Sequence, residues 1–291
     1  MKTILYATDY SINSVAALKY AHKMSEEMGT RLVVTHVFGY PIILGLEDLN
    51  KPFPHSEENA FLHHREQLEE FCAEHLGNQW KSPNVQVEPV TEKSVVQGII
   101  SKAIDWHAYL IIVGVKGESA VRELLVGSTT KHLMEKAPCP ILAVPTDAGY
   151  LHPKTIVYAS DFEEEDIYAI RKLAEMAESL DAEIKVVHIS TKKEYVGEMH
   201  MEWFKDQLKK KVTYSRIGFE LLFSEDVFES LRLYLGEVNA DLIVMLERKK
   251  KGLSKKWFHR DLVKKMETYG KVPLLSFREG NHQLFYFKAA L

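Results

Sequence analysis

The feature that most constrains the fold of this chain is an internal repeat. Residues 2–10, KTILYATDY, match residues 154–162, KTIVYASDF, when the sequence is compared with itself at an offset of 152 residues. The match continues without a gap until His36–Val37 meets His188–Ile189. A single long offset indicates one duplicated domain, because the units of solenoid proteins recur every ~20 to 50 residues.

The chain length agrees with a duplication. A chain of 291 residues is too long for one average domain, and two domains of about 140 residues would each bury a sizeable core. A segment that contains proline and glycine, residues 145–153, provides the boundary. We therefore predict one domain at 1–146, a second at 152–279 and a tail at 280–291.

Each copy is predicted to alternate strands with helices. In the first copy, β-branched and apolar runs indicate strands, and a helical spacing of apolar residues indicates helices between them. The predicted strands are 3–8, 31–37, 85–90, 109–113 and 140–144, and the predicted helices are 11–28, 57–76, 95–106 and 127–136. This order predicts an α/β fold in which each copy forms a doubly wound, parallel, five-stranded sheet. Ligands of such sheets bind at the carboxyl ends of the strands.

A glycine pattern follows the fourth predicted strand. Two residues separate Gly114 from Gly117, and after nine further residues the predicted helix at 127–136 opens with Gly-Ser-Thr. Glycine lacks a Cβ and leaves room for a ligand to approach the backbone, and the free N–H groups at a helix start attract an anion. The pattern is typical of a phosphate site. A glycine turn followed by a capped helix is the alternative.

Composition and charge exclude several classes of function. The formal net charge of -4 provides no overall attraction to nucleic acid or to an anionic membrane. Cys72 and Cys139 lie far apart without a metal-type spacing. Residues 1–5 enter a predicted strand and not a signal peptide, and no apolar run approaches the roughly 18 to 20 residues of a membrane span. These features predict a cytoplasmic protein.

Three further segments each have an ordinary and a more specific interpretation. We interpret the basic segment 248–256 as a solvated loop, with an acidic partner or phosphate groups as the alternative, and its few aromatic residues give nucleic-acid binding little support. The histidine-rich stretch 55–75 is interpreted as a surface helix of mixed polarity and not as a metal site, because no tight ligand spacing occurs. The apolar residues 284–287 of the tail would dock on their own domain or add a strand at a dimer edge.

The ordered motifs resemble those of the universal stress protein family. The resemblance rests on ILYATD at 4–9, RLVVTHV at 31–37, the glycine pattern at 114–129 and APCPILAV at 137–144, and it covers nearly the whole chain as a tandem member with two such domains. It implies a Rossmann-like fold of the adenine nucleotide alpha hydrolase type. The glycine pattern marks the branch of the family that binds ATP, so the resemblance implies an ATP-binding stress or regulatory protein.

By resemblance, residues of the first copy would line an ATP site. The adenine and ribose end would be formed by Ala7, Thr8, Asp9 and Val37. The ribose and α-phosphate side would be formed by Val113, Gly114, Lys116 and Gly117. The later phosphates, through which Mg²⁺ would be held, would contact Gly127, Ser128, Thr129 and Thr130. Asp9 would accept a hydrogen bond from the base or the sugar, and Val37 would offer backbone hydrogen bonds to adenine. Lys116 stands where the family often has arginine, and it lacks the planar, two-pronged hydrogen bonding of a guanidinium.

The second copy lacks the glycine pattern. Leu246 lies at about the position of the first glycine, Lys249 at that of the second, and Arg260–Asp261 replaces Gly-Ser. We predict that this copy retains the fold and has lost the ATP site. Asp161 corresponds to Asp9 and is then predicted to form a structural ion pair or to cap the helix that follows it.

The sequence favours binding over catalysis. Near the predicted phosphate site it contains no general base, no paired carboxylates for Mg²⁺ and no Walker lysine after the final glycine, so we assign no catalytic residue and no metal ligand. The leading hypothesis is a regulatory protein that acts through nucleotide-linked conformation or assembly. The alternatives are a ligand-free scaffold for dimerisation or partner binding, and a slow ATPase or an adenylyl transferase, whose His-x-Gly-His type signature does not follow Asp9.

The resemblance also implies how the two copies associate. The strands at 140–144 and 273–277 would pair in an intramolecular pseudo-dimer of the two domains. Whether two chains then form a homodimer remains open.

Overall fold

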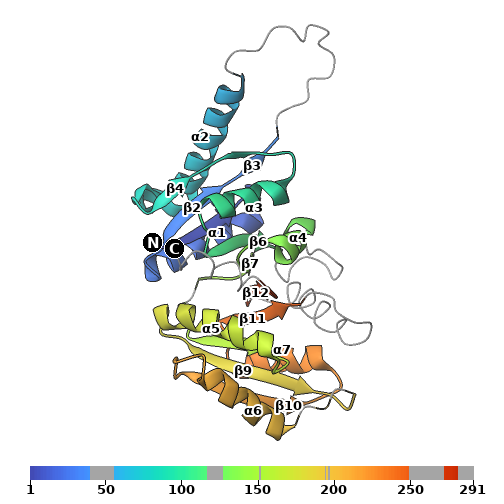
Figure 1. The fold of residues 1–291 in the computed structure, drawn as a ribbon. Coiled ribbons are helices and arrows are strands. Elements are labelled where there is room, and N and C mark those ends of the chain that lie inside the picture. Colours follow the sequence, from blue (N-terminus) through green and yellow to red (C-terminus); the bar gives the residue numbers. More distant parts are fainter. Residues whose placement is uncertain are drawn as a thin grey trace, which may run out of the picture.

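The computed structural model describes residues 1–39, 56–116, 127–150, 152–193, 195, 197–248 and 272–280. Most of their strands form one large sheet with helices on both faces (Figure 1). The predictions made for Gly117, for residues 249–261 and for the apolar tail lie outside the described residues.

The N-terminal half follows the predicted order of elements. Its strands are β1 (Thr3–Ala7), β2 (Arg31–Thr35), β3 (Val37–Phe38), β4 (Val85–Val87), β5 (Val90–Thr91), β6 (Leu110–Val115) and β7 (Ile141–Pro145). Its helices are α1 (Ile12–Glu27), α2 (Ser56–Leu76), a 3₁₀ turn at Gly77–Lys81, α3 (Val95–Asp105) and α4 (Ser128–Lys136). Local signals set several ends: the side chain of Ser94 caps α3 by accepting from the Gln97 N–H, and Gly29 adopts a left-handed φ of 59° just after α1.

The described part of the C-terminal half also alternates strands with helices. Its strands are β8 (Thr155–Ala159), β9 (Glu183–Ser190), β10 (Ile217–Phe223), β11 (Leu242–Glu247) and β12 (Leu274–Arg278), and its helices are α5 (Glu164–Ser179), α6 (Glu198–Lys209) and α7 (Val227–Glu237). The side chain of Asp226 caps α7, and a capping box between Glu163 and Asp166 begins α5.

Two predicted strands are each divided in the structure. The prediction at 85–90 becomes β4 and β5, because Pro89 lies between them and has no N–H to contribute to a ladder. The prediction at 31–37 becomes β2 and β3, which are separated at His36. β3 and β5 pair in parallel as a small second sheet beyond the main one.

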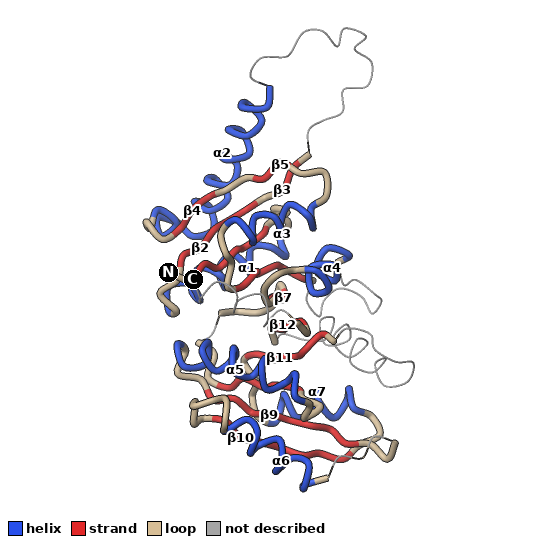
Figure 2. Tube along the Cα trace, viewed as in Figure 1, coloured by secondary structure: helices blue, strands red, loops and turns tan. Residues whose placement is uncertain are grey.

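The main sheet joins the two halves edge to edge. Its strand order is β10-β9-β8-β11-β12-β7-β6-β1-β2-β4, and each half contributes parallel strands. The halves meet where β12 runs antiparallel to β7, with Leu274 opposite Ala143 and Leu275 opposite Leu142. The two segments that were expected to pair are therefore neighbours inside a single chain. Figure 2 shows the N-terminal half above this junction and the C-terminal half below it.

Both faces of the sheet are buried, as expected for a doubly wound fold. Side chains alternate along β1, so that Ile4 and Tyr6 belong to the core under α1, α2, α5 and α6, whereas Leu5 belongs to the core under α3, α4 and α7. Each of the two cores continues through both halves. None of the helices in the described part of the chain is long and apolar enough to cross a membrane.

Candidate functional site

The backbone after β1 forms a tightly bonded corner. The Thr8 N–H donates to the carbonyl oxygen of Thr35 at 2.9 Å, and the Thr8 hydroxyl donates to Ser14 Oγ at 3.0 Å. Asp9 Oδ1 accepts the N–H of Ser11 at 3.0 Å, which closes a turn of the kind that Asp side chains favour. Asp9 itself is exposed. The carboxylate is therefore held by its own turn at the carboxyl end of a central strand, where it can accept a hydrogen bond from a ligand.

The backbone of Val37 faces away from its neighbouring strand. On either side of Val37, the carbonyl oxygens of His36 and Phe38 accept the N–H groups of Val90 and Glu92, at 2.9 and 3.0 Å. In a parallel ladder the peptide groups that bond to one neighbour alternate with groups that face the opposite side, so the N–H and C=O of Val37 point to that opposite side. This geometry agrees with the expected backbone hydrogen bonds to a ligand base.

The position of Val37 depends on a glycine that the sequence analysis did not single out. A Cβ on Gly98 of α3 would lie 2.7 Å from Val37 Cγ1. The missing side chain lets α3 pack directly on β3. No spacing pattern marks Gly98, because its contact joins segments that are distant in the sequence.

Gly114 has a different physical role from the one predicted. The prediction ended the strand at residue 113, yet β6 continues to Val115, so Gly114 lies inside a strand. A Cβ on Gly114 would lie 2.4 Å from the carbonyl oxygen of Asn13 and 2.9 Å from Ser14 Cα. The glycine therefore admits the first turn of α1 against the sheet and lies in a strand, not in the expected turn, while its predicted contact with a ligand stays a prediction.

The first turn of α4 has backbone N–H groups without partners inside the helix. Gly127 is its N-cap residue and provides no side-chain cap, and the first turn contains no acidic residue. Among the described residues, a Cβ on Gly127 would meet only Thr130 Oγ1, at 4.0 Å, so this part of the chain leaves the space beside it open. Ser128 is exposed, Thr129 is half-buried and Thr130 is buried. The unsatisfied N–H groups and the positive end of the helix dipole suit an anion.

The sheet brings part of the predicted set together. Ala7 of β1 pairs with Val113 of β6 and with Thr35 of β2, so the corner at Thr8 and Asp9 adjoins the end of β6. Lys116 follows directly after β6 and is exposed. α4 packs against α3 and β7. Gly117 lies outside the described residues, and its predicted contact stays a prediction.

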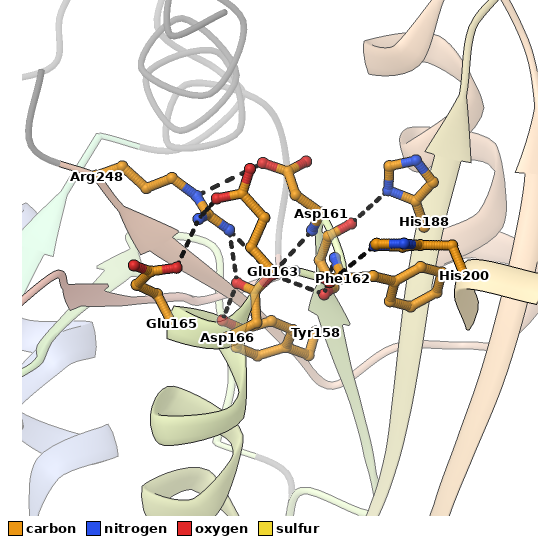
Figure 3. Close-up of polar contacts among 10 residues, drawn as sticks. Tyr158, Asp161, Phe162, Glu163, Glu165, Asp166, His188, His200 and Arg248 are labelled. Atoms are coloured by element: carbon orange, nitrogen blue, oxygen red, sulfur yellow. Dashed lines mark hydrogen bonds and ion pairs between the residues drawn. The ribbon is translucent and has the colours of Figure 1, made fainter. Parts of the chain in front are cut away.

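The equivalent corner in the C-terminal half is filled by an arginine. β11 pairs with β8 in the same register as β6 with β1, which confirms that Leu246 takes the place of Gly114 and shows that Arg248 takes the place of Lys116. The side chain of Arg248 is only 7% exposed. Figure 3 shows its guanidinium surrounded by carboxylates of the loop between β8 and α5 and of the first turn of α5. For Arg248, the interpretation of 248–256 as a solvated loop is therefore wrong.

Arg248 connects most of the acidic side chains around it. Its Nη2 donates to both carboxylate oxygens of Asp166 at 2.9 Å, its Nη1 donates to Glu163, and its Nε lies 3.5 Å from Asp161 Oδ2. Burial alone would lower the pKa of Arg248, but Asp166, Asp161 and Glu163 raise it above the ordinary value. The ion pair predicted for Asp161 is present, with Arg248 as its partner.

Asp166 is the centre of this cluster and is 1% exposed. It also accepts from the Tyr158 hydroxyl at 2.9 Å, from Ser160 Oγ at 3.0 Å and from the Asp161 N–H at 3.1 Å. Burial, followed by the negative charge of Asp166, raises the pKa of Tyr158 well above its ordinary value. The carboxylate therefore has a donor for each of its hydrogen-bonding positions, which is what a buried charge requires.

A stack of aromatic and imidazole rings joins α2 to the N-terminal corner. The ring of His64 stacks on that of Phe38 at 3.9 Å between centroids, the ring of His36 lies 5.7 Å from that of His64, and the ring of Tyr10 lies 4.5 Å from that of His36. Among the described residues no group of three or more His, Cys, Asp or Glu side chains is arranged to hold a metal. The histidines therefore pack as rings in this part of the chain.

We expect this stack to weaken as the pH falls. Burial, with smaller contributions from His36 and His63, lowers the pKa of His64 below its ordinary value of 6.5. As the pH falls through 6.5, His64 becomes protonated in the unfolded chain before it does in the folded chain, so the free energy of unfolding decreases. The decrease should be less than about 1 kcal/mol, because solvent screens the charge at this site. Urea unfolding at pH 7.5 and 5.5 tests this.

His64→Phe keeps a ring on Phe38 and should reduce the pH dependence. His132→Gln, which alters an exposed histidine on α4, should leave it unchanged. An unaltered pH dependence in the His64 variant would contradict the assignment.

Comparisons with known proteins agree with this architecture. A family model described as the universal stress protein family matches residues 1–145. A curated relative from Thermus aquaticus, the universal stress protein in the QAH/OAS sulfhydrylase 3' region, is 32% identical over 149 residues, which are 49% of this chain and 98% of the relative. Universal stress protein MJ0577 of Methanocaldococcus jannaschii is 26% identical over 160 residues, which are 49% of this chain and 94% of the relative.

Solved structures are similar in fold across both halves. A universal stress protein from Archaeoglobus fulgidus has a TM-score of 0.65 at 17% identity and covers 96% of this chain and 98% of its own. A putative universal stress protein from Pseudomonas aeruginosa has a TM-score of 0.60 at 15% identity and covers 100% of this chain and 98% of its own. The sequence relatives thus match one half, and the structural relatives match the whole sheet.

Proposed function

Because this chain belongs to the universal stress protein family, we propose that its N-terminal half binds ATP and that the protein regulates other components through nucleotide-linked conformation or assembly. The difference between the two halves carries this proposal. At the same place in the fold, the N-terminal half has an exposed Lys116, whereas the C-terminal half has Arg248, whose side chain is buried and forms ion pairs with Asp161, Glu163 and Asp166. One corner is open to a ligand and the other is already occupied.

The open corner offers groups that suit each part of a nucleotide. The exposed carboxylate of Asp9 accepts a hydrogen bond from a ribose hydroxyl or an amino group, and the outward backbone of Val37 bonds the edge of adenine. The bare backbone at Gly127 and the α4 N-terminus receive phosphates, which would in turn hold Mg²⁺. Gly117 would complete this cradle.

A second function is favoured for the C-terminal half alone. Its corner is closed by Arg248 and its strand β12 extends the sheet of the N-terminal half, which supports a role as a ligand-free scaffold.

Both cysteines are free and buried, which agrees with a reducing compartment and supports a cytoplasmic location.

Calorimetry of the full chain with ATP, ADP and AMP tests the proposed function. We expect one ATP per chain. Asp9→Ala should weaken ATP binding by several-fold to about tenfold, the usual effect of losing one hydrogen bond to a ligand. Asp161→Ala removes the equivalent carboxylate from the closed corner and should leave the affinity for ATP unchanged.

Two results would count against this proposal. A stoichiometry near two would show that the C-terminal half also binds nucleotide. Equal losses of affinity in the Asp9 and Asp161 variants would mean that the C-terminal half also holds a nucleotide.

A further inference from the structure

Both halves hold the corner after their first strand in the same way. In the N-terminal half, Nδ1 of His36 lies 2.8 Å from the carbonyl oxygen of Thr8, and the Tyr10 N–H donates to Thr8 Oγ1 at 3.0 Å. Because a carbonyl oxygen only accepts hydrogen bonds, the proton of His36 is on Nδ1. The ring of Tyr10 packs against the imidazole at 4.5 Å between centroids. Thr8 is thereby fixed through both its carbonyl and its hydroxyl.

The C-terminal half repeats each of these contacts. His188 Nδ1–H donates to the carbonyl oxygen of Ser160 at 2.7 Å, the Phe162 N–H donates to Ser160 Oγ at 2.9 Å, and the ring of Phe162 lies 5.2 Å from that of His188 (Figure 3). The contacts are the same although one corner is open and the other is filled by Arg248. These contacts therefore stabilise the backbone of the corner itself and do not depend on whether Arg248 fills it.

The corner needs this support because its backbone is strained. Tyr10 has a φ of 62° and Phe162 has a φ of 56°, in the left-handed region that side chains other than glycine disfavour. Such a conformation persists only where surrounding contacts hold it. Besides the histidine, Phe71 of α2 contacts Tyr10 edge-on at 5.4 Å, and Phe204 of α6 contacts Phe162 at 5.1 Å.

The ring of Tyr10 provides this support without its hydroxyl. Tyr10 Oη is buried and has no hydrogen-bond partner in the described part of the chain. The equivalent residue, Phe162, has no hydroxyl at all. A phenyl ring at position 10 should therefore be sufficient.

We propose that His36 and Tyr10 are positioning residues for the ligand site, which hold the backbone of Thr8 and Tyr10 in the left-handed corner that presents Asp9. They act through Asp9 and not by touching the ligand. In the C-terminal half, His188 and Phe162 perform the same task for Asp161, and the group that Asp161 receives is Arg248. This inference rests on the proposed function, because ATP is the ligand whose binding reports on the position of Asp9.

The test measures ATP binding by calorimetry and corner rigidity by amide hydrogen exchange in the full chain. His36→Leu removes the donor to Thr8, and Tyr10→Ala removes the ring. Each should weaken ATP binding about tenfold and speed exchange of the Tyr10 amide, while the circular dichroism spectrum stays native. If His36→Leu does not fold, His36→Gln, whose amide reaches a different position, replaces it.

Conservative variants should rescue both effects. His36→Asn places an N–H donor near the position of Nδ1, and Tyr10→Phe keeps the ring, so both should bind ATP within about threefold of the wild type. The repeat supplies matched controls. His188→Leu and Phe162→Ala remove the same contacts from the other half and should lower its stability without changing the affinity for ATP.

The outcomes separate this proposal from the proposed function. Wild-type affinity in His36→Leu and Tyr10→Ala would overturn the positioning role, and so would an equal loss of affinity in His188→Leu. A wild-type chain that binds no ATP would refute the proposed function. In that case unchanged exchange of the Tyr10 amide in His36→Leu would overturn the positioning role as well.

Discussion

Replacing Arg248 with methionine will lower the free energy of unfolding by about 3–5 kcal/mol, the usual cost of removing one partner from a buried ion pair. Methionine retains an unbranched apolar stem and removes the guanidinium. Asp166, which is 1% exposed, then loses two hydrogen bonds of 2.9 Å and its compensating charge. The carboxylates of Asp161 and Glu163, which flank the guanidinium, are left to repel Asp166.

Urea unfolding at neutral pH, followed by circular dichroism, measures this loss. Arg232→Met is the matched control, because Arg232 also pairs with a carboxylate, that of Glu229, but both side chains are partly exposed on α7. That variant should lose less than about 1 kcal/mol. Similar losses in the two variants would mean that Arg248 is no more important than a surface arginine, and the description of a filled corner would then fail.

Gly127→Val will abolish ATP binding, with a loss of affinity greater than about 100-fold, and will leave the fold intact. The backbone at Gly127 has a φ of -55° and a ψ of 132°, which other residues adopt readily, and the space around its Cβ position is open. Two added methyl groups would then occupy the space in which phosphates approach the α4 N-terminus. The loss would be steric at the ligand and would not involve the core.

Gly114→Ala provides the opposite result and serves as the comparison. Its Cβ would lie 2.4 Å from the carbonyl oxygen of Asn13, which is backbone and cannot rotate away. We expect a loss of stability of about 1–3 kcal/mol from overpacking, because α1 must shift from the sheet. Calorimetry measures the affinity of both variants for ATP, and urea unfolding measures their stability. Normal ATP binding in Gly127→Val would remove α4 from the site, and an undiminished stability in Gly114→Ala would contradict the close approach of α1.

The sequence by itself determined the fold class and its duplication. The offset match of KTILYATDY and KTIVYASDF required two similar units, and continuous apolar runs such as 110–113 and 141–144 required strands covered on both faces. These features could be predicted because strand and helix periodicity are local properties. The replacement of Gly114 by Leu246 was also readable from the sequence, since the two residues belong to equivalent apolar runs of the repeat.

Only the tertiary structure decided why particular residues occupy the corners. Spacing marked Gly114 as a ligand glycine, but the atom nearest to its missing Cβ belongs to Asn13, about a hundred residues earlier in the sequence. The ion pair of Asp161 was expected, yet its partner could not be chosen among neighbouring basic residues until the sheet register placed Arg248 beside Asp166. Contacts of this kind depend on which loops the strand order brings to one edge, and a side chain's role follows from the atoms within a few ångströms of it. Sequence patterns record the residues of a segment, whereas packing between distant segments decides whether a glycine admits a helix or a ligand.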